Sequence, residues 1–270
     1  MEQNYLIYKI SGGLAHMLYQ INNAVQLSMR TKRHLIIDCY SHTFCNDFNK
    51  YFNIPNLEYD TTYDCLYKDT TLSNEMFEQY IKPEVIYVDF HQYFLNNKSV
   101  MVDAWRVVND NSRIICCTWV EGIDVFGKSP WYIKVNKNIV EQIPVNIIKE
   151  PYVGVHYRNT DMKTDLNSVI QKVRHLPPEI QTLYLSTDDY TAFDAFNSAI
   201  GYRFKIVQHT KPFNDGGSNI HYGNPNKDEI ILNTLIDIYN LSKAAHFIGN
   251  NKSGLSRKVE EIRITDNFFK

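Results

Sequence analysis

Three side chains that can hold or move charge follow a short apolar run near the middle of the chain. His156, Arg158 and Asp161 stand just after Val153 and Val155, whose β-branched side chains are typical of a buried strand. The arginine offers a planar fork of donors that fits phosphate oxygens, and the histidine can donate to a phosphate or to a ring. This spacing predicts a site for an anionic ligand. The alternative is structural, with Arg158 paired to Asp161 across a turn and His156 satisfied inside the core.

Two adjacent carboxylates follow the next strand-like run. Asp188 and Asp189 come after residues 182–186 and precede a helical pattern. The carboxyl ends of parallel strands meet at one edge of an open α/β sheet, and such sheets bind their ligands there. We therefore expect both aspartates near His156. The alternative is that Thr187 or Asp188 caps the following helix.

The last strand-like run, residues 245–249, ends in a polar loop that contains Ser253 and Ser256 and opens the final helix. A helix N-terminus with free N–H groups at a strand end favours an anion. Just upstream, Asp237 lies among the apolar residues of a predicted helix over residues 228–242. A buried carboxylate without a partner is costly, so Asp237 is expected to face the site or to form a buried ion pair.

The N-terminal segment shows the same order of elements. Residues 5–10 alternate like a strand and end before Gly12 and Gly13, residues 14–30 repeat with a helical period, and residues 34–38 read as a second buried strand. Glycines at such a turn let the backbone approach a ligand. The pattern is not a G-x-G-x-x-G dinucleotide fingerprint, so the turn alone carries little specificity.

The order of elements predicts an α/β protein. Further strand-like runs cover residues 84–90 and 113–120, and residues 136–150 lack clear amphipathic order. At 270 residues the chain exceeds the usual size of one domain. We predict two domains, residues 1–148 and 149–270.

Composition excludes several classes of protein. A net charge of −2 and a pI near 6.5 argue against nucleic-acid binding, which needs a basic surface. The five cysteines form no C-x-x-C pair, which favours a reduced, intracellular protein. The N-terminal residues do not show the basic segment and long apolar core of a signal peptide. No apolar run is long enough for a membrane span, so we expect a cytoplasmic protein. The histidines lack zinc-ligand spacing, so no metal site is expected.

The segment from Gly122 to Ser129 reads G-x-x-x-x-G-K-S, the pattern of a phosphate-binding P-loop. Ile123, Val125 and Phe126 crowd the loop, which favours a chance match. A P-loop NTPase or kinase built on this segment is kept as the alternative function.

Four segments together resemble the α1,6-fucosyltransferase superfamily, which includes the nodulation fucosyltransferases and is related to the α1,2- and protein O-fucosyltransferases. They are the Gly12-Gly13 turn with the helix and strand after it, the segment VGVHYRNTD, the segment LYLSTDD, and the block IDIYNLSKAAHFIGNNKSGLSRKVEE. The resemblance implies a GT-B-like architecture, with two Rossmann-like domains whose parallel sheets face a cleft. It implies inverting transfer of fucose from GDP-fucose, or of a related sugar from its GDP-sugar, to a glycan acceptor, with no cofactor and no essential metal.

The resemblance also implies roles for residues at matching positions. Arg158 would hold the β-phosphate and help GDP to leave, His156 would contact the nucleotide, and Asp237 would recognise guanine. Ser253 would lie near the diphosphate, with Ser256 as a second candidate, and Asp188 and Asp189 would support the pocket. The remaining substrate-binding candidates lie in the N-terminal turn: Gly12, Gly13 and His16.

The sequence departs from the family pattern at three places. Asn159 stands where the α1,6 enzymes carry a second arginine, which leaves open a non-catalytic sugar-nucleotide-binding protein. The acidic residue proposed as the base has no equivalent at its own position, and Asp161 and Asp165 are nearby candidates, of which we take Asp161 as catalytic. The family's G-x-G-N-Q element is replaced by residues 13–17, so the acceptor is not predicted.

Overall fold

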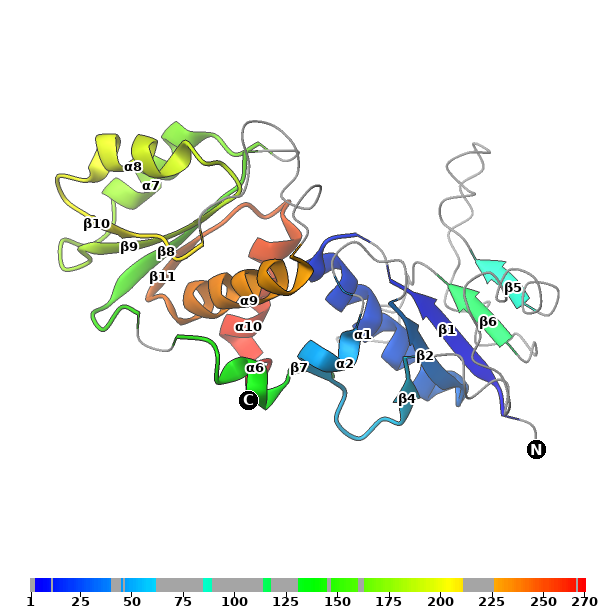
Figure 1. The fold of residues 1–270 in the computed structure, drawn as a ribbon. Coiled ribbons are helices and arrows are strands. Elements are labelled where there is room, and N and C mark those ends of the chain that lie inside the picture. Colours follow the sequence, from blue (N-terminus) through cyan, green and yellow to red (C-terminus); the bar gives the residue numbers. More distant parts are fainter. Residues whose placement is uncertain are drawn as a thin grey trace, which may run out of the picture. The chain divides into compact units, whose positions relative to one another are not determined.

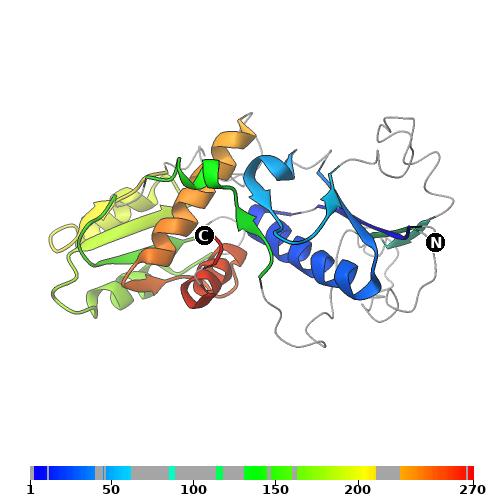
Figure 2. The same cartoon turned by 90° about the horizontal axis from the view of Figure 1, so that it is seen from below.

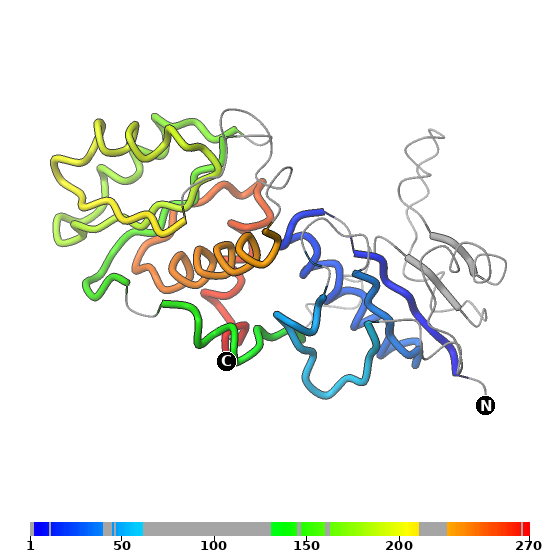
Figure 3. Tube along the Cα trace, in the orientation of Figure 1, coloured from blue at the N-terminus to red at the C-terminus, as the bar shows by residue number. Residues whose placement is uncertain are grey.

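The computed structural model describes residues 3–10, 12–39, 45, 47–61, 85–88, 114–117, 131–144, 147–159, 163–210, 226–265 and 267–270, with 85–88 and 114–117 as backbone (Figure 3). The chain divides into two compact units, Met1–Val135 (unit 1) and Asn136–Lys270 (unit 2). This division comes earlier than the predicted boundary after residue 148. The expected cleft between the domains stays a prediction.

Unit 1 is built on a five-stranded parallel sheet with the order β4-β2-β1-β6-β5 (Figures 1 and 2). Its strands are β1 (Tyr5–Lys9), β2 (His34–Asp38), β4 (Tyr59–Asp60), β5 (Val85–Val88) and β6 (Ile114–Cys117), and a two-stranded antiparallel ribbon joins β3 (Phe52–Asn53) to β7 (Lys134–Val135). Its helices are α1 (Leu14–Thr31) and the short α2 (Phe48–Tyr51). Helix α1 forms because its apolar residues recur every three or four positions, and these residues are buried.

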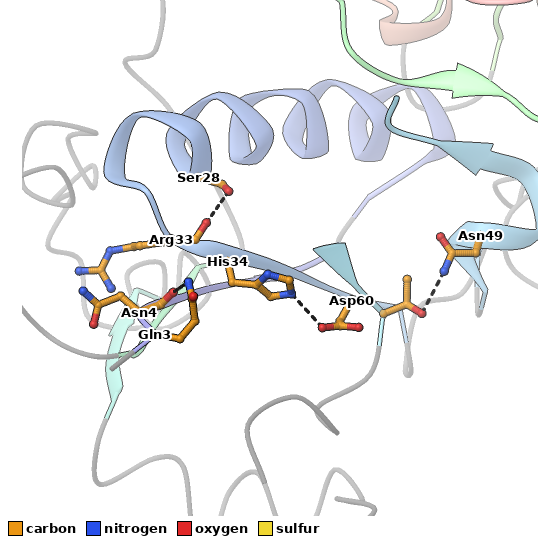
Figure 4. A network of polar contacts seen from close by, with 8 residues as sticks. Gln3, Asn4, Ser28, Arg33, His34, Asn49 and Asp60 are labelled. Carbon is orange, nitrogen blue, oxygen red and sulfur yellow. Dashed lines mark hydrogen bonds and ion pairs between the residues drawn. The ribbon is translucent and has the colours of Figure 1, made fainter. Parts of the chain in front are cut away.

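Hydrogen bonds connect the amino end of β2 to α1 and to β4 (Figure 4). The Ser28 hydroxyl donates to the carbonyl oxygen of Arg33 over 2.7 Å, which closes the turn between α1 and β2. His34 Nε2 and Asp60 Oδ2 lie 2.8 Å apart and tie β2 to the edge strand β4. Because His34 is the first residue of β2, these contacts lie away from the carboxyl end of that strand, where a ligand is expected.

Unit 2 is a four-stranded parallel sheet with the order β10-β9-β8-β11 and helices on both faces (Figure 1). The strands are β8 (Tyr152–Tyr157), β9 (Thr182–Thr187), β10 (Lys205–Val207) and β11 (His246–Ile248). The helices are α6 (Lys137–Val140), α7 (Leu166–Arg174), α8 (Ala192–Ile200), α9 (Lys227–Lys243) and α10 (Gly254–Thr265). Consecutive strand and helix units of this kind are doubly wound, and the α/β class with parallel sheets is confirmed.

The central strand β8 sends alternate side chains to the two faces of the sheet. Val153, Val155 and Tyr157 join the apolar core under α7 and α8. On the other face, the Tyr152 hydroxyl donates to the carbonyl oxygen of Asn240 in α9. Because side chains alternate along a strand, His156 points to the α9 and α10 side.

Gly154 lets α9 pack closely on β8. A Cβ atom at this position would lie 3.0 Å from the Cβ of Ala244 and 3.1 Å from Leu241 Cδ2. We expect Gly154→Ala to lower the free energy of unfolding by about 1–3 kcal/mol, the usual cost of overpacking a core. Chemical denaturation would measure this loss. A variant as stable as the parent protein would show that α9 can move away without cost.

Within the described residues, every helix is too short or too polar to cross a lipid bilayer.

Candidate functional site

The polar side chains of unit 2 gather where its parallel strands end. Strands β8 and β9 are in register, so that His156 lies beside Ser186 and Tyr157 beside Thr187. The chain leaves β8 at Arg158 and β9 at Asp188, which places both residues at the carboxyl edge of the sheet. The sequence-based placement of these residues at one edge is confirmed by this register.

Arg158 is held by a carboxylate from the neighbouring strand. Its Nε lies 3.7 Å from Asp188 Oδ2, with the two side chains 19% and 11% exposed. This pairing fixes the guanidinium in place and leaves part of it at the surface. The structural alternative of an Arg158–Asp161 pair is not tested, because Asp161 lies outside the described residues.

Asn159 links the segments that follow β8 and β9. Its backbone N–H donates to Asp188 Oδ1 and its side-chain amide donates to Asp189 Oδ2, each over 2.7 Å. Asp188 therefore supports both Arg158 and the backbone beside it. In the sequence, Asn159 was noted only because it replaces an arginine of the family pattern. No local feature of the sequence predicts that it bridges two strands.

Asp189 organises the turn into α8. Its Oδ1 accepts the backbone N–H and the hydroxyl of Thr191, over 2.9 and 2.7 Å. Burial acts to raise the pKa of Asp189, but the hydrogen bonds from Thr191 and Asn159 hold it below the ordinary value. The predicted capping by Thr187 or Asp188 is wrong. The N-cap residue of α8 is Thr191, while the Thr187 hydroxyl accepts the N–H of Asp189 and Asp188 faces β8.

His156 is buried, with 5% of its surface exposed, and contacts a serine of α10. Its Nδ1 lies 2.7 Å from Ser256 Oγ, and the same oxygen accepts the backbone N–H of Asn250 over 3.0 Å. Burial, and then the charge of Arg158, lower the pKa of His156 to about 3. The imidazole is therefore neutral at pH 7 and cannot attract a phosphate through charge.

Helix α10 begins at this edge of the sheet. Ser253 directly precedes the helix, and its carbonyl oxygen accepts the N–H of Arg257. The Ser253 side chain is fully buried, and in the described part of the chain its hydroxyl has no hydrogen-bond partner. An unpaired buried hydroxyl is costly, and a ligand oxygen at the helix N-terminus would satisfy it.

Asp237 of α9 is held by three hydroxyl groups. Its Oδ1 accepts from Tyr184 over 2.7 Å and from Thr210 over 3.3 Å, and its Oδ2 accepts from Ser186 over 2.8 Å. Burial raises the pKa of Asp237 to about 6, although these hydrogen bonds act to lower it. Of the two alternatives for Asp237, the buried ion pair is wrong, because the partners are neutral hydroxyls, and the other alternative, that it faces a ligand, stays a prediction. Tyr184 and Ser186 share one face of β9, and this two-residue spacing is the signal that sequence reasoning missed.

The N-terminal candidates lie in unit 1, in the turn between β1 and α1. Gly12 has a φ of +74°, a conformation that favours glycine, and a Cβ there would lie 2.8 Å from Cδ2 of His16. Gly13 is the N-cap residue of α1, and its carbonyl oxygen accepts the N–H of Met17. These residues form a tight turn at the carboxyl end of β1, and whether they contact a substrate stays a prediction.

The P-loop pattern from Gly122 to Ser129 lies outside the described residues. Among the residues that are described, no three His, Cys, Asp or Glu side chains come together to hold a metal ion.

Comparisons with known proteins give a match in structure. No protein-family model matches the chain, and no curated protein sequence does. Fucosyltransferase NodZ from Bradyrhizobium matches with a TM-score of 0.61 at 17% identity, over 96% of this chain and 92% of that one. A structure of NodZ α-1,6-fucosyltransferase soaked with GDP-fucose gives a TM-score of 0.62 at 18% identity over the same shares. POFUT1 in complex with GDP matches with a TM-score of 0.55 at 12% identity, over 99% of this chain and 97% of that one.

These identities are low, so the match establishes the fold. The chain has the GT-B-like fold of the fucosyltransferases, and the resemblance drawn from its motifs is confirmed at that level.

Proposed function

We propose that this chain is a glycosyltransferase that moves fucose from GDP-fucose, or a related sugar from its GDP-sugar, to a glycan acceptor. The observation that carries the proposal is the placement of Arg158. The guanidinium stands at the carboxyl edge of the unit 2 sheet, held by Asp188, in a fold shared with proteins crystallised with GDP and GDP-fucose.

The chemistry of the reaction suits this arrangement. When the sugar leaves, negative charge grows on the β-phosphate of GDP, and a cation already fixed in place stabilises that charge where it develops. The N-terminus of α10 and the Ser253 hydroxyl offer further donors. In this proposal Arg158 touches the phosphate, and Asp188 acts through Arg158 as a positioning residue.

The remaining roles are proposals of the same kind. Asp161 takes the proton from the attacking acceptor hydroxyl, and inversion at the sugar carbon follows from attack opposite the departing GDP. No metal and no cofactor are needed, because protein donors neutralise the diphosphate. Asp237 has three of its lone-pair positions filled by hydroxyls, so it retains room for one donor from a guanine ring. The glycan acceptor and the cytoplasmic location stay predictions.

The choice of nucleotide tests this proposal. We expect GDP to raise the melting temperature of the protein more than UDP or ATP at equal concentration. A ligand at 100 times its dissociation constant stabilises the folded state by about 2.7 kcal/mol. Differential scanning fluorimetry across the three nucleotides, with and without Mg²⁺, measures this preference.

Each result supports a different function. Stabilisation by Mg-ATP alone, lost in Lys128→Ala, would support the P-loop NTPase or kinase and contradict the transferase. Stabilisation by GDP without release of GDP from GDP-fucose, across a panel of glycan acceptors, would support a non-catalytic sugar-nucleotide-binding protein. Release of GDP that depends on one acceptor would establish the transferase and identify that acceptor.

A further inference from the structure

His156 and Ser256 form a buried pair that joins β8 to α10. The two side chains come from positions 100 residues apart, and their contact atoms lie 2.7 Å from each other. Ser256 is fully buried, so water does not compete for its hydroxyl. Such a contact restricts which nitrogen of the imidazole carries the proton.

The partners of Ser256 decide the direction of this hydrogen bond. Its oxygen already accepts the backbone N–H of Asn250 over 3.0 Å. Among the described residues, Nδ1 of His156 is the acceptor within reach of the serine proton. If Nδ1 carried a proton, the serine hydroxyl would receive two donors and its own proton would be buried without an acceptor, which is costly. The arrangement that satisfies all atoms has Ser256 donating to a bare Nδ1.

The second ring nitrogen of His156 then carries the proton. Within the described residues Nε2 has no hydrogen-bond partner. His156 also lies two residues before Arg158, on the strand that ends at the candidate site. A donor in this position is set to meet an acceptor atom of a ligand.

Gly249, which has no side chain, leaves space for the hydroxyl of Ser256. A Cβ atom on Gly249, at the end of β11, would lie 2.6 Å from Ser256 Oγ and 2.6 Å from the ring of Phe247. A larger residue at position 249 would therefore push Ser256 away from His156. The glycine, the serine and the histidine fit together as one unit.

We propose that Ser256 is a positioning residue that fixes His156 as the Nε2–H tautomer, so that this imidazole donates a hydrogen bond to an acceptor atom of the bound GDP moiety. The acceptor is a carbonyl oxygen or ring nitrogen of the base, or a phosphate oxygen. The donor half of this inference rests on the proposed function, whereas the tautomer is a property of the ligand-free protein. It follows that His156 does not act as the base of the reaction, because Nδ1 is occupied and Nε2 already holds its proton.

Nitrogen-15 NMR of the histidine side chains at pH 7 tests the tautomer directly. The chain has nine histidines, so the His156 signals are assigned by their loss in His156→Gln. We expect a protonated Nε2 and a bare Nδ1 in the ligand-free protein. In Ser256→Ala we expect a mixture of the two tautomers, and in Ser256→Thr, which keeps the hydroxyl, the parent pattern. A protonated Nδ1 in the parent protein, or an unchanged pattern in Ser256→Ala, would overturn the proposal.

Binding and turnover test the donor role in the same variants. We expect Ser256→Ala to weaken GDP binding by about tenfold, which corresponds to 1.4 kcal/mol. The KM for the GDP-sugar should rise more than kcat falls, and Ser256→Thr should restore both. Thr265→Ala removes an exposed hydroxyl at the far end of α10 and should leave binding unchanged.

The two readouts separate the two proposals. If no guanine nucleotide binds the parent protein, the proposed function and the donor role of His156 both fail, while the NMR result still decides whether Ser256 sets the tautomer. If GDP binds equally well to the parent protein and to Ser256→Ala with altered tautomers, the donor role of His156 alone is overturned.

Discussion

Arg158→Ala should lower the rate of sugar transfer by about 10²–10³-fold, the usual effect of removing one preorganised contact to the charge that develops in a transition state. The effect is expected in kcat as well as in kcat/KM, because the charge on the β-phosphate grows as the sugar leaves. The rate of Arg158→Lys should lie between those of the parent protein and Arg158→Ala, since an ammonium keeps the charge but lacks the planar fork. The rate of GDP release from the GDP-sugar in the presence of an acceptor measures each variant.

Controls separate this catalytic effect from a change in folding. Arg158 lies just past the end of β8 and is partly exposed, and we expect the backbone N–H of Asn159 to keep its hydrogen bond to Asp188 when the guanidinium is removed. Far-UV circular dichroism of Arg158→Ala should therefore match that of the parent protein, with a lower melting temperature because Asp188 loses its ion-pair partner. Arg174→Ala removes an exposed arginine at the C-terminal end of α7 and should transfer sugar at the parent rate. Unchanged turnover in a folded Arg158→Ala variant would end the proposed mechanism.

The regular elements of unit 2 follow from local patterns in the sequence. Strand β8 is a short β-branched run between polar segments, and α9 repeats its apolar residues with a helical period over four turns. Both patterns depend on which side chains must be buried, so they are visible without the rest of the molecule. The same reasoning places the carboxyl ends of β8, β9 and β11, and with them the candidate site.

The short elements of unit 1 were not predicted. Helix α2 has four residues and strands β3 and β4 have two each, which is about one period of an amphipathic pattern and too short to show a repeat. Strand β4 is held by its pairing with β2 and by the contact of Asp60 with His34. The formation of these short elements therefore depends on contacts with residues distant in the sequence, and a local sequence pattern does not predict such contacts.

The hydrogen-bond and ion-pair partners of Asp188 also depend on residues distant in the sequence. The alternative interpretation had Thr187 or Asp188 cap α8, but the guanidinium of Arg158 and the N–H of Asn159 draw Asp188 to the neighbouring strand. A cap contributes about 1 kcal/mol, and a charge-assisted contact to an arginine and a backbone N–H offers more. The sequence shows that an aspartate follows β9, and the register of β8 and β9 decides what it binds.

Asp237 should make the stability of unit 2 depend on pH. Burial raises its pKa from the ordinary value of 3.8 to about 6, so the folded protein holds this proton more tightly than the unfolded chain does. The stabilisation by the protonated carboxyl is complete below pH 4 and is lost as the pH rises through 6. Each pKa unit corresponds to 1.36 kcal/mol, so this group lowers the free energy of unfolding by on the order of 3 kcal/mol between those limits.

Asp237→Asn should remove this dependence, because an amide does not ionise in this range and can still accept from a hydroxyl through its oxygen. Urea unfolding at a series of pH values from 4 to 8 measures the slope in both proteins. Far-UV circular dichroism follows both units, and tryptophan fluorescence follows unit 1, because Trp105, Trp119 and Trp131 all precede residue 136. Asp194→Asn removes an exposed negative charge from α8 and should keep the parent slope. If Asp237→Asn loses stability between pH 4 and 8 as steeply as the parent protein, the buried carboxylate is not the cause, and the three hydroxyls of Tyr184, Ser186 and Thr210 compensate its charge in full.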